Sequence, residues 1–422
     1  MSVLALLVSC VIAVLLFAVC TATLWWMIHA WQSPEAFESV DFATSSSPWL
    51  SFSIIMPCRD EPLAVMEPTL DRLLAQTHLA VEVILSVGDD DPATVAVAHA
   101  LAARNPDRVR VSINHDPVKN KPRQLNTALP MCRGDVVGIM DAESLAHPEL
   151  IERVDATFQQ RGADVVQGAV HLMNYRSRWF SLRNCLEYRI WFRSRLHGHA
   201  GSGFIPLGGN TVFVYRELLE QVGGWDGDCL AEDCEIGVRL SALGKRVVCG
   251  YEPELTTLEE APTTVKSFVK QRTRWALGFM QVLAKGEWRS LPTRGQQLRG
   301  WWTLAQQYAM AFAGVAVPIG FVSALFLNIP TPLAMLTYLP VMPMVLTMGF
   351  EMLVLREFGR DMRLKIGLRD YATLVLSTPF YQALLAFSAI NAVFKFWRGD
   401  FGWDKTRHSG AHLSVVRLAD AA

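Results

Sequence analysis

Gln271, Arg274 and Trp275 are spaced so that their side chains can share one face of a helix. Residues i, i+3 and i+4 lie on the same side of an α-helix. The arginine fork can bind phosphate oxygens, the glutamine amide can donate or accept a hydrogen bond, and the indole can stack on a sugar. The three side chains would therefore suit a diphosphate held beside a sugar ring. We expect their helix to have Pro262 in its first turn.

A second interpretation of the same segment is an amphipathic helix that lies on a membrane surface. Its cations would point toward lipid phosphates, and its tryptophan would lie at the interface. The two interpretations are equally good for this segment taken alone. Both can hold at once if Arg272 faces lipid while Gln271, Arg274 and Trp275 face a ligand.

Charged side chains also follow four apolar segments in the first third of the chain. A single acidic turn is usually a solvated loop or a helix cap. Four charged turns at matching positions are much harder to explain in that way, and they indicate a binding site. The side chains concerned are Asp60, Asp89, Asp90, Lys121, Asp141 and Glu143.

Asp141 and Glu143 are separated by one residue, so both carboxylates can reach the same hard cation. Carboxylates repel phosphate unless a divalent cation lies between them. The pair therefore predicts Mg²⁺ or Mn²⁺ bridging the protein to a diphosphate. Asp89 or Asp90 is expected to accept hydrogen bonds from a ribose or a base, and Lys121 would add a positive charge nearby.

The acceptor side of such a site is expected farther along the chain, at the glycine turn 205–211 and the acidic segment 230–235. The glycines would allow a ligand close to the backbone, although a packing turn explains them equally well. Carboxylates in the first turn of a helix are usually there because of its dipole. Deprotonating a sugar hydroxyl needs a base, however, and Asp233 is the candidate.

The elements that must position these side chains alternate between short strands and helices. Near-continuous apolar strands alternating with helices predict an α/β fold with an open, mostly parallel sheet covered on both faces. Ligands bind such sheets beyond the carboxyl ends of the strands, where the charged turns lie. The predicted strands are 52–56, 81–87, 109–113, 136–140, 165–170 and 212–215, and the predicted helices are 63–75, 93–104, 124–129, 148–159 and 216–221.

Apolar segments at both ends indicate an integral membrane protein, in which 51% of the 422 residues are hydrophobic. A first span is expected at 3–28, which is too long for a signal peptide. Three more are expected at 305–327, 335–355 and 371–396, the last interrupted by Pro379. The predicted organisation is an N-terminal transmembrane helix at 1–32, a globular domain with interface helices at 33–299, a transmembrane region at 300–397 and a tail at 398–422.

Charge and cysteine content add two expectations. A formal net charge of −1 gives no argument for binding nucleic acid. The eight cysteines include no CxxC pair and no Cys/His spacing typical of a zinc site. Scattered cysteines in a cytosolic domain are usually plain core residues, so we expect neither disulfides nor zinc.

Residues 51–280 resemble the processive, membrane-bound glycosyltransferases of family 2. That family includes the synthases of cellulose, chitin-type oligosaccharides, hyaluronan and poly-N-acetylglucosamine, which share a D, D, D, QxxRW pattern. In this chain Asp89–Asp91 resembles the first acidic element, Asp141–Glu143 the DxD element, Ala231–Asp233 the T-E-D element and Gln271–Trp275 the QxxRW motif. The segments around 186–188, 206–209, 224–226, 259–262 and 403–408 look closest to a bacterial subgroup of β-glycan synthases.

The chain departs from this pattern at two positions. Glu143 ends the DxD element and should still bind metal, whereas Ala231 loses a hydroxyl but keeps the base that follows. The resemblance implies a GT-A type domain that transfers a sugar from a UDP-sugar with inversion. In that scheme Asp233 is the base, Asp60, Asp89, Asp90, Lys121, Asp141, Gln271 and Arg274 bind the nucleotide, Trp275 and Glu232 bind the acceptor, and Asp141 and Glu143 hold Mg²⁺ or Mn²⁺.

The resemblance further implies a multi-pass protein of a bacterial inner membrane, with a cytoplasmic catalytic domain, a growing β-linked polysaccharide as acceptor and separate export or regulatory subunits. One alternative is a non-processive enzyme that adds a sugar to a membrane lipid, as ceramide glucosyltransferases do. Another is a silent membrane protein that only binds nucleotide or glycan. The complete set of carboxylates, Asp233 above all, argues against the silent protein.

The expected topology contains a conflict. A cytoplasmic domain after one span puts the amino terminus outside, and three further spans put the segment Trp403–His408 outside as well. Its basic character favours the inside. A bend at Pro379 that makes 371–396 re-entrant would reconcile the two.

Overall fold

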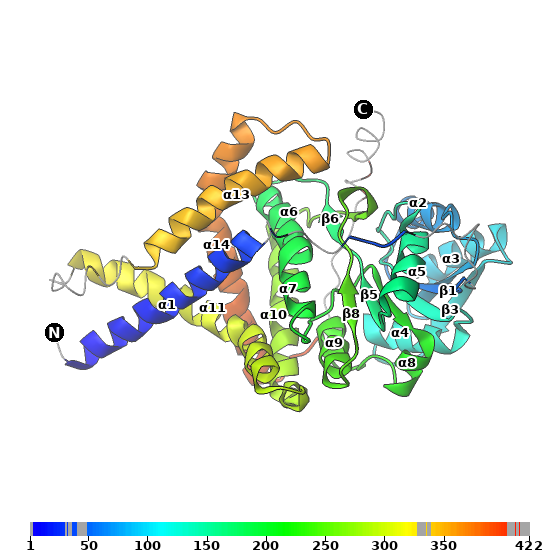
Figure 1. The fold of residues 1–422 in the computed structure, drawn as a ribbon, viewed down its shortest axis with the longest axis horizontal. Coiled ribbons are helices and arrows are strands. Elements are labelled where there is room, and N and C mark those ends of the chain that lie inside the picture. The colour runs from blue at the N-terminus through cyan, green and yellow to red at the C-terminus, as the bar shows by residue number, and fades with distance from the viewer. Residues whose placement is uncertain are drawn as a thin grey trace.

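The computed structural model describes residues 3–29, 32, 36–39, 49–326, 335, 339–402, 410 and 413. Its α/β half and its long helices lie at opposite ends of the molecule (Figure 1). Between them lie α6 (Ser181–Ile190), α7 (Leu196–Ala200) and α10 (Val265–Lys285). The helix that carries Gln271, Arg274 and Trp275 thus belongs to the middle layer.

The main sheet has seven strands in the order β3-β2-β1-β4-β7-β5-β8. Among these strands β7 alone runs antiparallel to its neighbours, β4 and β5, which confirms the predicted open, mostly parallel sheet. The strands are β1 (Phe52–Cys58), β2 (Val81–Gly88), β3 (Val109–Asn114), β4 (Val136–Ile139), β5 (Val165–Gln167), β7 (Val212–Tyr215) and β8 (Val247–Cys249).

The predicted strand 165–170 is wrong in one respect, because it divides between two sheets. After β5 the chain turns at Gly168, whose N–H donates to the Thr211 carbonyl at 2.7 Å. A Cβ at Gly168 would lie 2.6 Å from Thr211 Cγ2, so a side chain would not fit in this turn. The chain then forms β6 (Val170–Leu172), which pairs in parallel with β9 (Thr257–Glu259) in a separate sheet.

Helices cover both faces of the main sheet. Successive strand residues point to opposite sides, so Ile54 packs with α2, α3 and α5 while Ile55 packs with α4, α8 and α9. These helices are α2 (Leu63–Leu74), α3 (Pro92–Arg104), α4 (Lys121–Ala128), α5 (Leu150–Arg161), α8 (Arg216–Gln221) and α9 (Glu232–Ala242), and the short helices are η1 (Leu129–Met131), η3 (Pro253–Leu255) and η4 (Glu287–Ser290).

The start of α10 differs from the prediction. Thr264 is its N-cap: the Thr264 hydroxyl accepts from the Ser267 N–H at 3.1 Å, and the Ser267 hydroxyl accepts in return from the Thr264 N–H at 3.2 Å. This capping box fixes the helix start at Val265. Pro262 therefore precedes the helix and does not lie in its first turn.

Four long helices make up the other half: α1 (Val3–His29), α11 (Arg294–Phe326), α13 (Val341–Asp361) and α14 (Leu368–Arg398). Two described segments, Cys10–His29 and α14, are long and apolar enough to cross a membrane. The predicted spans 305–327 and 335–355 correspond to α11 and α13, although residues 327 and 336–338 lie outside the described part of the chain. The predicted boundary between residues 299 and 300 falls inside α11.

The second half of α13 is bound to the middle layer by charged groups. Arg183 of α6 forms an ion pair with Glu351 at 2.7 Å, and Arg189 binds Asp361 at 2.5 Å. Both arginine side chains are at most 5% exposed. The predicted span 335–355 thus includes Glu351, whose carboxylate is bound to α6 of the middle layer.

Helix α14 is continuous through Pro379, so the prediction of a re-entrant bend there is wrong. Both ends of α14 contact the α/β side of the molecule. Near its start Asp370 binds Arg176 at 2.7 Å, and near its end Ala392 packs in one apolar cluster with Leu230 and Met280. Its outward face exposes apolar side chains, among them Leu376, Phe380, Phe387 and Trp397.

The chain returns to the α/β half after α14. The Gly410 N–H donates to Glu260 Oε2 at 2.7 Å, next to the end of β9. The predicted basic segment Trp403–His408 lies outside the described residues. Gly410 nevertheless places one point of the tail against the domain that holds the charged turns.

Candidate active site

The carboxyl ends of β3, β2, β1 and β4 are neighbours in the sheet, so the four charged turns meet along one edge. Arg59 binds both oxygens of Asp90, at 3.0 and 2.7 Å. Lys119 lies 2.5 Å from Asp89 Oδ1. The adjacent carboxylates of the first acidic element are thus each held by a cation from a neighbouring turn.

These ion pairs keep the two carboxylates charged. The Lys119 ammonium lowers the pKa of Asp89, and the Arg59 guanidinium lowers the pKa of Asp90. Asp91 has a different role, because its side chain accepts from the Thr94 N–H at 3.1 Å and caps α3. Any nucleotide contact of Asp89 or Asp90 would have to share carboxylates that already bind cations.

Asp60 lies beside this group in an unusual backbone conformation. Its φ is 51°, and its N–H donates to Asp91 Oδ2 at 2.5 Å. Non-glycine residues with positive φ are uncommon, and they concentrate at ligand sites. The turn after β1 is therefore held in a strained form by the turn after β2.

Lys121 joins a second group, at the end of β4. Its ammonium lies 2.5 Å from Asp141 Oδ1 and donates to the Gly209 carbonyl at 2.6 Å. Burial opposes this charge, but Asp141 and the nearby Glu232 outweigh it and hold the pKa of Lys121 above its ordinary value. A permanent cation therefore lies between the DxD-like element and the glycine turn.

Asp233 and Glu232 form the first turn of α9 and lie on the other side of Gly209. A Cβ at Gly209 would be 2.9 Å from Asp233 Oδ2, so the turn needs a glycine to admit this carboxylate. Burial raises the pKa of Asp233. Burial and the Asp233 charge raise the pKa of Glu232 to about 7. The charges of Lys121 and Arg274 oppose both shifts.

Asn210 connects the two sides of the site, a role that the sequence did not indicate. Its Oδ1 accepts from the Asp141 N–H at 3.1 Å and from the Thr211 N–H at 2.7 Å. Its amide donates to Ser144 Oγ at 2.7 Å and to Glu259. Thr211 has a φ of 54°, which for a β-branched residue is a true outlier. A buried hydrogen-bond network thus fixes the backbone from which Asp141 projects.

The side chains of α10 are placed individually, and one of them, Arg272, differs from the prediction. Gln271 is buried, and its Oε1 has no hydrogen-bond partner among the described residues. The Arg274 charge lowers the pKa values of Glu232 and Asp233, so its guanidinium lies on their side of the helix. The Trp275 ring lies 6.0 Å from the ring of Tyr188.

Arg272 is the exception, because it does not face lipid. Its guanidinium binds Glu187 and Asn184 and lies 4.8 Å from the Trp275 ring. Its Nη2 also donates to the Tyr381 hydroxyl of α14 at 3.3 Å. The prediction that Arg272 points to the membrane is therefore wrong, since packing between α6, α10 and α14 encloses it.

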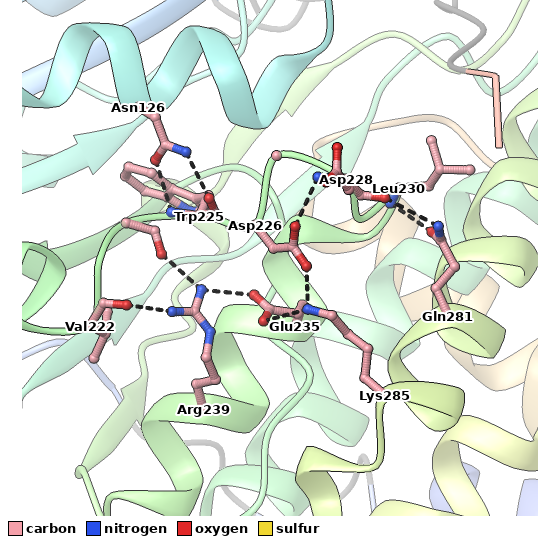
Figure 2. A network of polar contacts seen from close by, with 12 residues as sticks. Asn126, Val222, Trp225, Asp226, Asp228, Leu230, Glu235, Arg239, Gln281 and Lys285 are labelled. Carbon is pink, nitrogen blue, oxygen red and sulfur yellow. Dashed lines mark hydrogen bonds and ion pairs between the residues drawn. The ribbon is translucent and has the colours of Figure 1, made fainter. Parts of the chain in front are cut away.

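The far end of α10 contacts the loop that precedes Asp233 (Figure 2). Gln281 Oε1 accepts from the Leu230 N–H at 2.9 Å, and Lys285 binds both Asp226 and Glu235. One turn earlier, a Cβ at Gly278 would lie 2.6 Å from the Ala231 nitrogen. Helix α10 therefore carries the Gln271–Trp275 motif and also anchors the backbone just before Asp233.

Asp141 and Glu143 fit a divalent cation of the Mg²⁺ type. The pKa of the Tyr188 hydroxyl is raised mainly by burial and by the charge of Glu259. Asp141 and Glu143 raise it further, so both carboxylates lie on the side of the site that Tyr188 borders. Lys121 binds only Oδ1 of Asp141. The described residues contain no group of three or more His, Cys, Asp or Glu side chains that could enclose a metal. Mg²⁺ commonly binds through one or two carboxylates and completes its shell with phosphates and water, which two carboxylates allow.

Comparison with known proteins gives the following likenesses. The family model described as glycosyltransferase like family 2 matches residues 48–278. A β-monoglucosyldiacylglycerol synthase from Nostoc is 28% identical over 197 residues, which cover 46% of this chain and 41% of that protein. A poly-β-1,6-N-acetyl-D-glucosamine synthase from Staphylococcus aureus is 23% identical over 255 residues, which cover 57% of this chain and 58% of that protein. The chain thus matches about half of the length of these relatives.

A solved structure also matches: the mannosyltransferase of Pyrobaculum calidifontis in complex with GDP-mannose and Mn²⁺. The TM-score is 0.54 and the identity is 18%, and the match covers 92% of this chain and 99% of that one. At this identity the likeness speaks for the fold alone. It agrees with the predicted GT-A type arrangement of the sheet.

Proposed function

We infer the function of this chain from its family: it belongs to the family 2 glycosyltransferases. We propose that it transfers a hexose or an N-acetylhexosamine from a UDP-sugar to a growing β-linked polysaccharide, with inversion at the anomeric carbon. The transfer would be processive and coupled to export. The observation that carries this proposal is the meeting of Asp233, Lys121 and Arg274 around the Gly209 turn.

The donor would bind along the edge formed by the four charged turns. Asp60, Asp89 and Asp90 would contact the base and ribose, where Arg59 and Lys119 keep the two carboxylates in place. Lys121, Gln271 and Arg274 would contact the diphosphate. Bound between Asp141 and Glu143, Mg²⁺ or Mn²⁺ would supply neutralisation of the diphosphate charge. The buried Gln271 Oε1 would gain a partner from the nucleotide or from its water.

In the transfer step Asp233 would take the proton of an acceptor hydroxyl as that oxygen attacks the anomeric carbon. The new bond joins the acceptor oxygen to the anomeric carbon, and the bond from this carbon to the β-phosphate oxygen breaks. The electron pair of the broken bond leaves with UDP, whose charge Arg274 and Lys121 stabilise. Burial assists Asp233, because a carboxylate with a raised pKa is a stronger base.

The acceptor would lie on the side of Trp275 that meets the helical half. Tyr188 extends the aromatic surface beside Trp275, and Glu232 would bind an acceptor hydroxyl. An aromatic surface fits a sugar face. The second candidate function is transfer of one sugar to a membrane lipid. It is favoured by the likeness of the chain to synthases whose name states a lipid product, glucosyldiacylglycerol.

We also propose a topology of three membrane crossings, by α1, α11 and α13. In Figure 1 these helices extend together away from the α/β half. Helix α14 would lie along the membrane surface, because both of its ends contact the catalytic side and its outward face is apolar. The catalytic domain and the tail would then share the cytoplasmic side of a bacterial inner membrane, which removes the conflict that four spans create.

The experiment that tests the function uses the purified full-length protein in lipid nanodiscs with a panel of UDP- and GDP-sugars and Mg²⁺ or Mn²⁺. Asp233→Asn serves as the matched control. A high-mass product from one UDP-sugar, absent with the variant, is the expected result. A product that is only small and lipid-extractable would replace the polymer proposal by the lipid one. Absence of transfer from every donor would contradict both.

A further inference from the structure

A group of nitrogen-bearing side chains lies where α1 crosses η2, the π-helical segment Trp191–Arg195, and α7. The crossing is fixed by Ser194, whose hydroxyl donates to the Trp26 carbonyl at 2.6 Å. It is close because Gly198 has no side chain, and a Cβ there would collide with the Trp26 ring. The group consists of His29, Arg195, His197 and His199.

Each member of this group has a buried nitrogen without a hydrogen-bond partner among the described residues. These atoms are Nδ1 of His29, Nε of Arg195, Nε2 of His197 and Nδ1 of His199. Leaving a buried polar group unsatisfied destabilises a fold, and the effect is larger for a charged group. Arg195 Nε is a donor, and each histidine nitrogen donates in one of its two tautomers, so a ligand with acceptor oxygens would satisfy these atoms.

Arg195 determines the charge of that ligand. Its Nε is buried without a hydrogen-bond partner in the part of the chain that the structure describes, although the side chain as a whole is half-buried, and burial lowers its pKa. The acidic group that acts on it is Glu187, which is already bound to Arg272. The neighbouring Arg193 differs, since it pairs with Glu357 at 3.4 Å. A cation that is partly withdrawn from water is stabilised by an anion, and the half-buried Arg195 has no anion of its own among the described residues.

His199 provides a second contact beside Arg195. The two residues are four positions apart on the same helical face. Burial, followed by the charges of Arg195 and Arg299, lowers the pKa of His199 to about 3, so the ring is neutral at physiological pH. A neutral imidazole keeps one N–H that can donate to an oxygen. The Trp26 ring lies 5.2 Å from His199 and closes one side of this place.

The position of the group at the end of a long apolar helix indicates the class of anion. The apolar segment Cys10–His29 ends at the crossing, where Trp25, Trp26 and Trp191 gather. Tryptophans concentrate at the level of lipid head groups, and basic pockets between helices at that level bind anionic head groups. π-Helical segments are also frequent at functional sites.

We propose that Arg195 and His199, with Trp26 beside them, bind the phosphate group of an anionic membrane lipid. This site would be additional to the sugar-transfer site and does not depend on it. A phosphodiester offers the two unesterified oxygens that Arg195 and His199 would share, while its acyl chains would continue along α1 into the bilayer.

Native mass spectrometry of the full-length protein in detergent tests the proposal without any sugar transfer. The titrants are phosphatidylglycerol, phosphatidylcholine and inorganic phosphate. We expect phosphatidylglycerol to bind wild type more tightly than phosphatidylcholine, and Arg195→Gln to weaken it at least about tenfold. Arg294→Gln, which removes an exposed charge at the start of α11, is the matched control and should bind as wild type does.

Two outcomes would overturn the proposal. Equal phosphatidylglycerol affinity of wild type and Arg195→Gln would show that Arg195 is not part of a site. Inorganic phosphate binding as tightly as phosphatidylglycerol would show a free-phosphate site instead of a lipid site. Because the readout is binding, neither outcome bears on the sugar-transfer proposal.

Thermal unfolding in the same detergent tests whether a folding defect of the variant explains any loss of lipid binding. Phosphatidylglycerol should raise the unfolding temperature of wild type and leave the unfolding temperature of Arg195→Gln unchanged. Without lipid the variant should be at least as stable as wild type, since it removes a half-buried charge that has no bound anion. Arg195→Lys keeps the charge and should recover most of the lipid effect, and failure of this rescue would contradict a charge-based site.

Discussion

The ammonium of Lys121 lies 2.5 Å from the carboxylate of Asp141, while the same ammonium donates to the carbonyl of Gly209 at 2.6 Å. One cation thus connects the DxD-like element to the turn that faces Asp233. Its charge lowers the pKa of Asp233, whose burial raises it. The pKa of Asp233, the proposed base, therefore depends on Lys121, which belongs to the proposed donor site.

Lys121→Gln should move the acid limb of the pH–rate profile to higher pH. Asp233 must be ionised to act as a base, so the rate rises as pH increases through its pKa. Removing Lys121 removes a charge that lowers this pKa, and the limb should shift upward by about one pH unit. The measurement is kcat/KM against pH. Lys245→Gln, which breaks a pair with Asp164 elsewhere, should leave the limb in place, and an unmoved limb in Lys121→Gln would contradict this electrostatic link.

Asp233→Asn should reduce kcat by about 10²–10⁴, the usual contribution of a general base. Binding of the nucleotide should change little, because the variant keeps the shape of the side chain and removes only its basicity. Asp228→Asn is a suitable control, since Asp228 is 83% exposed and pairs with Arg123. Steady-state kinetics and UDP titration by calorimetry separate the two effects. A normal turnover rate in Asp233→Asn would show that another group takes the proton.

Arg272 and Arg274 are two residues apart on α10 and should respond to the same substitution in different ways. Arg272→Gln leaves Glu187 without its cation and should cost about 1–3 kcal/mol of stability, seen as a lower unfolding midpoint. Arg274→Gln should lower kcat/KM by about 10²–10³ with a smaller change in midpoint. If Arg272→Gln were as stable as wild type, the enclosed position of Arg272 would be refuted.

Gly278→Ala should destabilise the protein and slow transfer. The added methyl would meet the backbone of Ala231, which cannot move aside as a flexible side chain could, and overpacking of this kind costs about 1–3 kcal/mol. Gly349→Ala on α13 is the matched control, because no atom lies within 4 Å of its Cβ position. Its midpoint should stay constant or rise slightly. Equal behaviour of the two variants would contradict the close packing of α10 on the turn before Asp233.

A reporter fused after residue 422 should lie on the same side of the membrane as the catalytic domain. Green fluorescent protein fused there should fluoresce, and alkaline phosphatase should be inactive, because α14 contacts the catalytic half at both ends. A fusion truncated after Phe326 at the end of α11 should give the opposite pair of results. An active phosphatase after residue 422 would mean that α14 crosses the bilayer.

The sequence was sufficient to predict six of the seven strands of the main sheet and the positions of the charged turns, because apolar strands and the residues that follow them are local features. It could not indicate that Asn210 holds the Asp141 backbone, since this contact joins residues 69 positions apart. The orientation of Arg272 was missed for a similar reason. Helical periodicity assigns a residue to a face, but only the packing of α6 and α14 on that face shows that it is covered.

Gln281 and Gly278 fasten α10 to the backbone ahead of Asp233, while on its other side Thr273 donates to the Ser388 carbonyl of α14 at 3.3 Å and Phe268 packs 5.3 Å from Tyr381. Cutting the chain before α11 to obtain a water-soluble enzyme would uncover that side of α10. The apolar surface so exposed would favour aggregation, and the motif residues would lose their support. The catalytic half is thus not a detachable module, and the long helix α14 serves as part of its core.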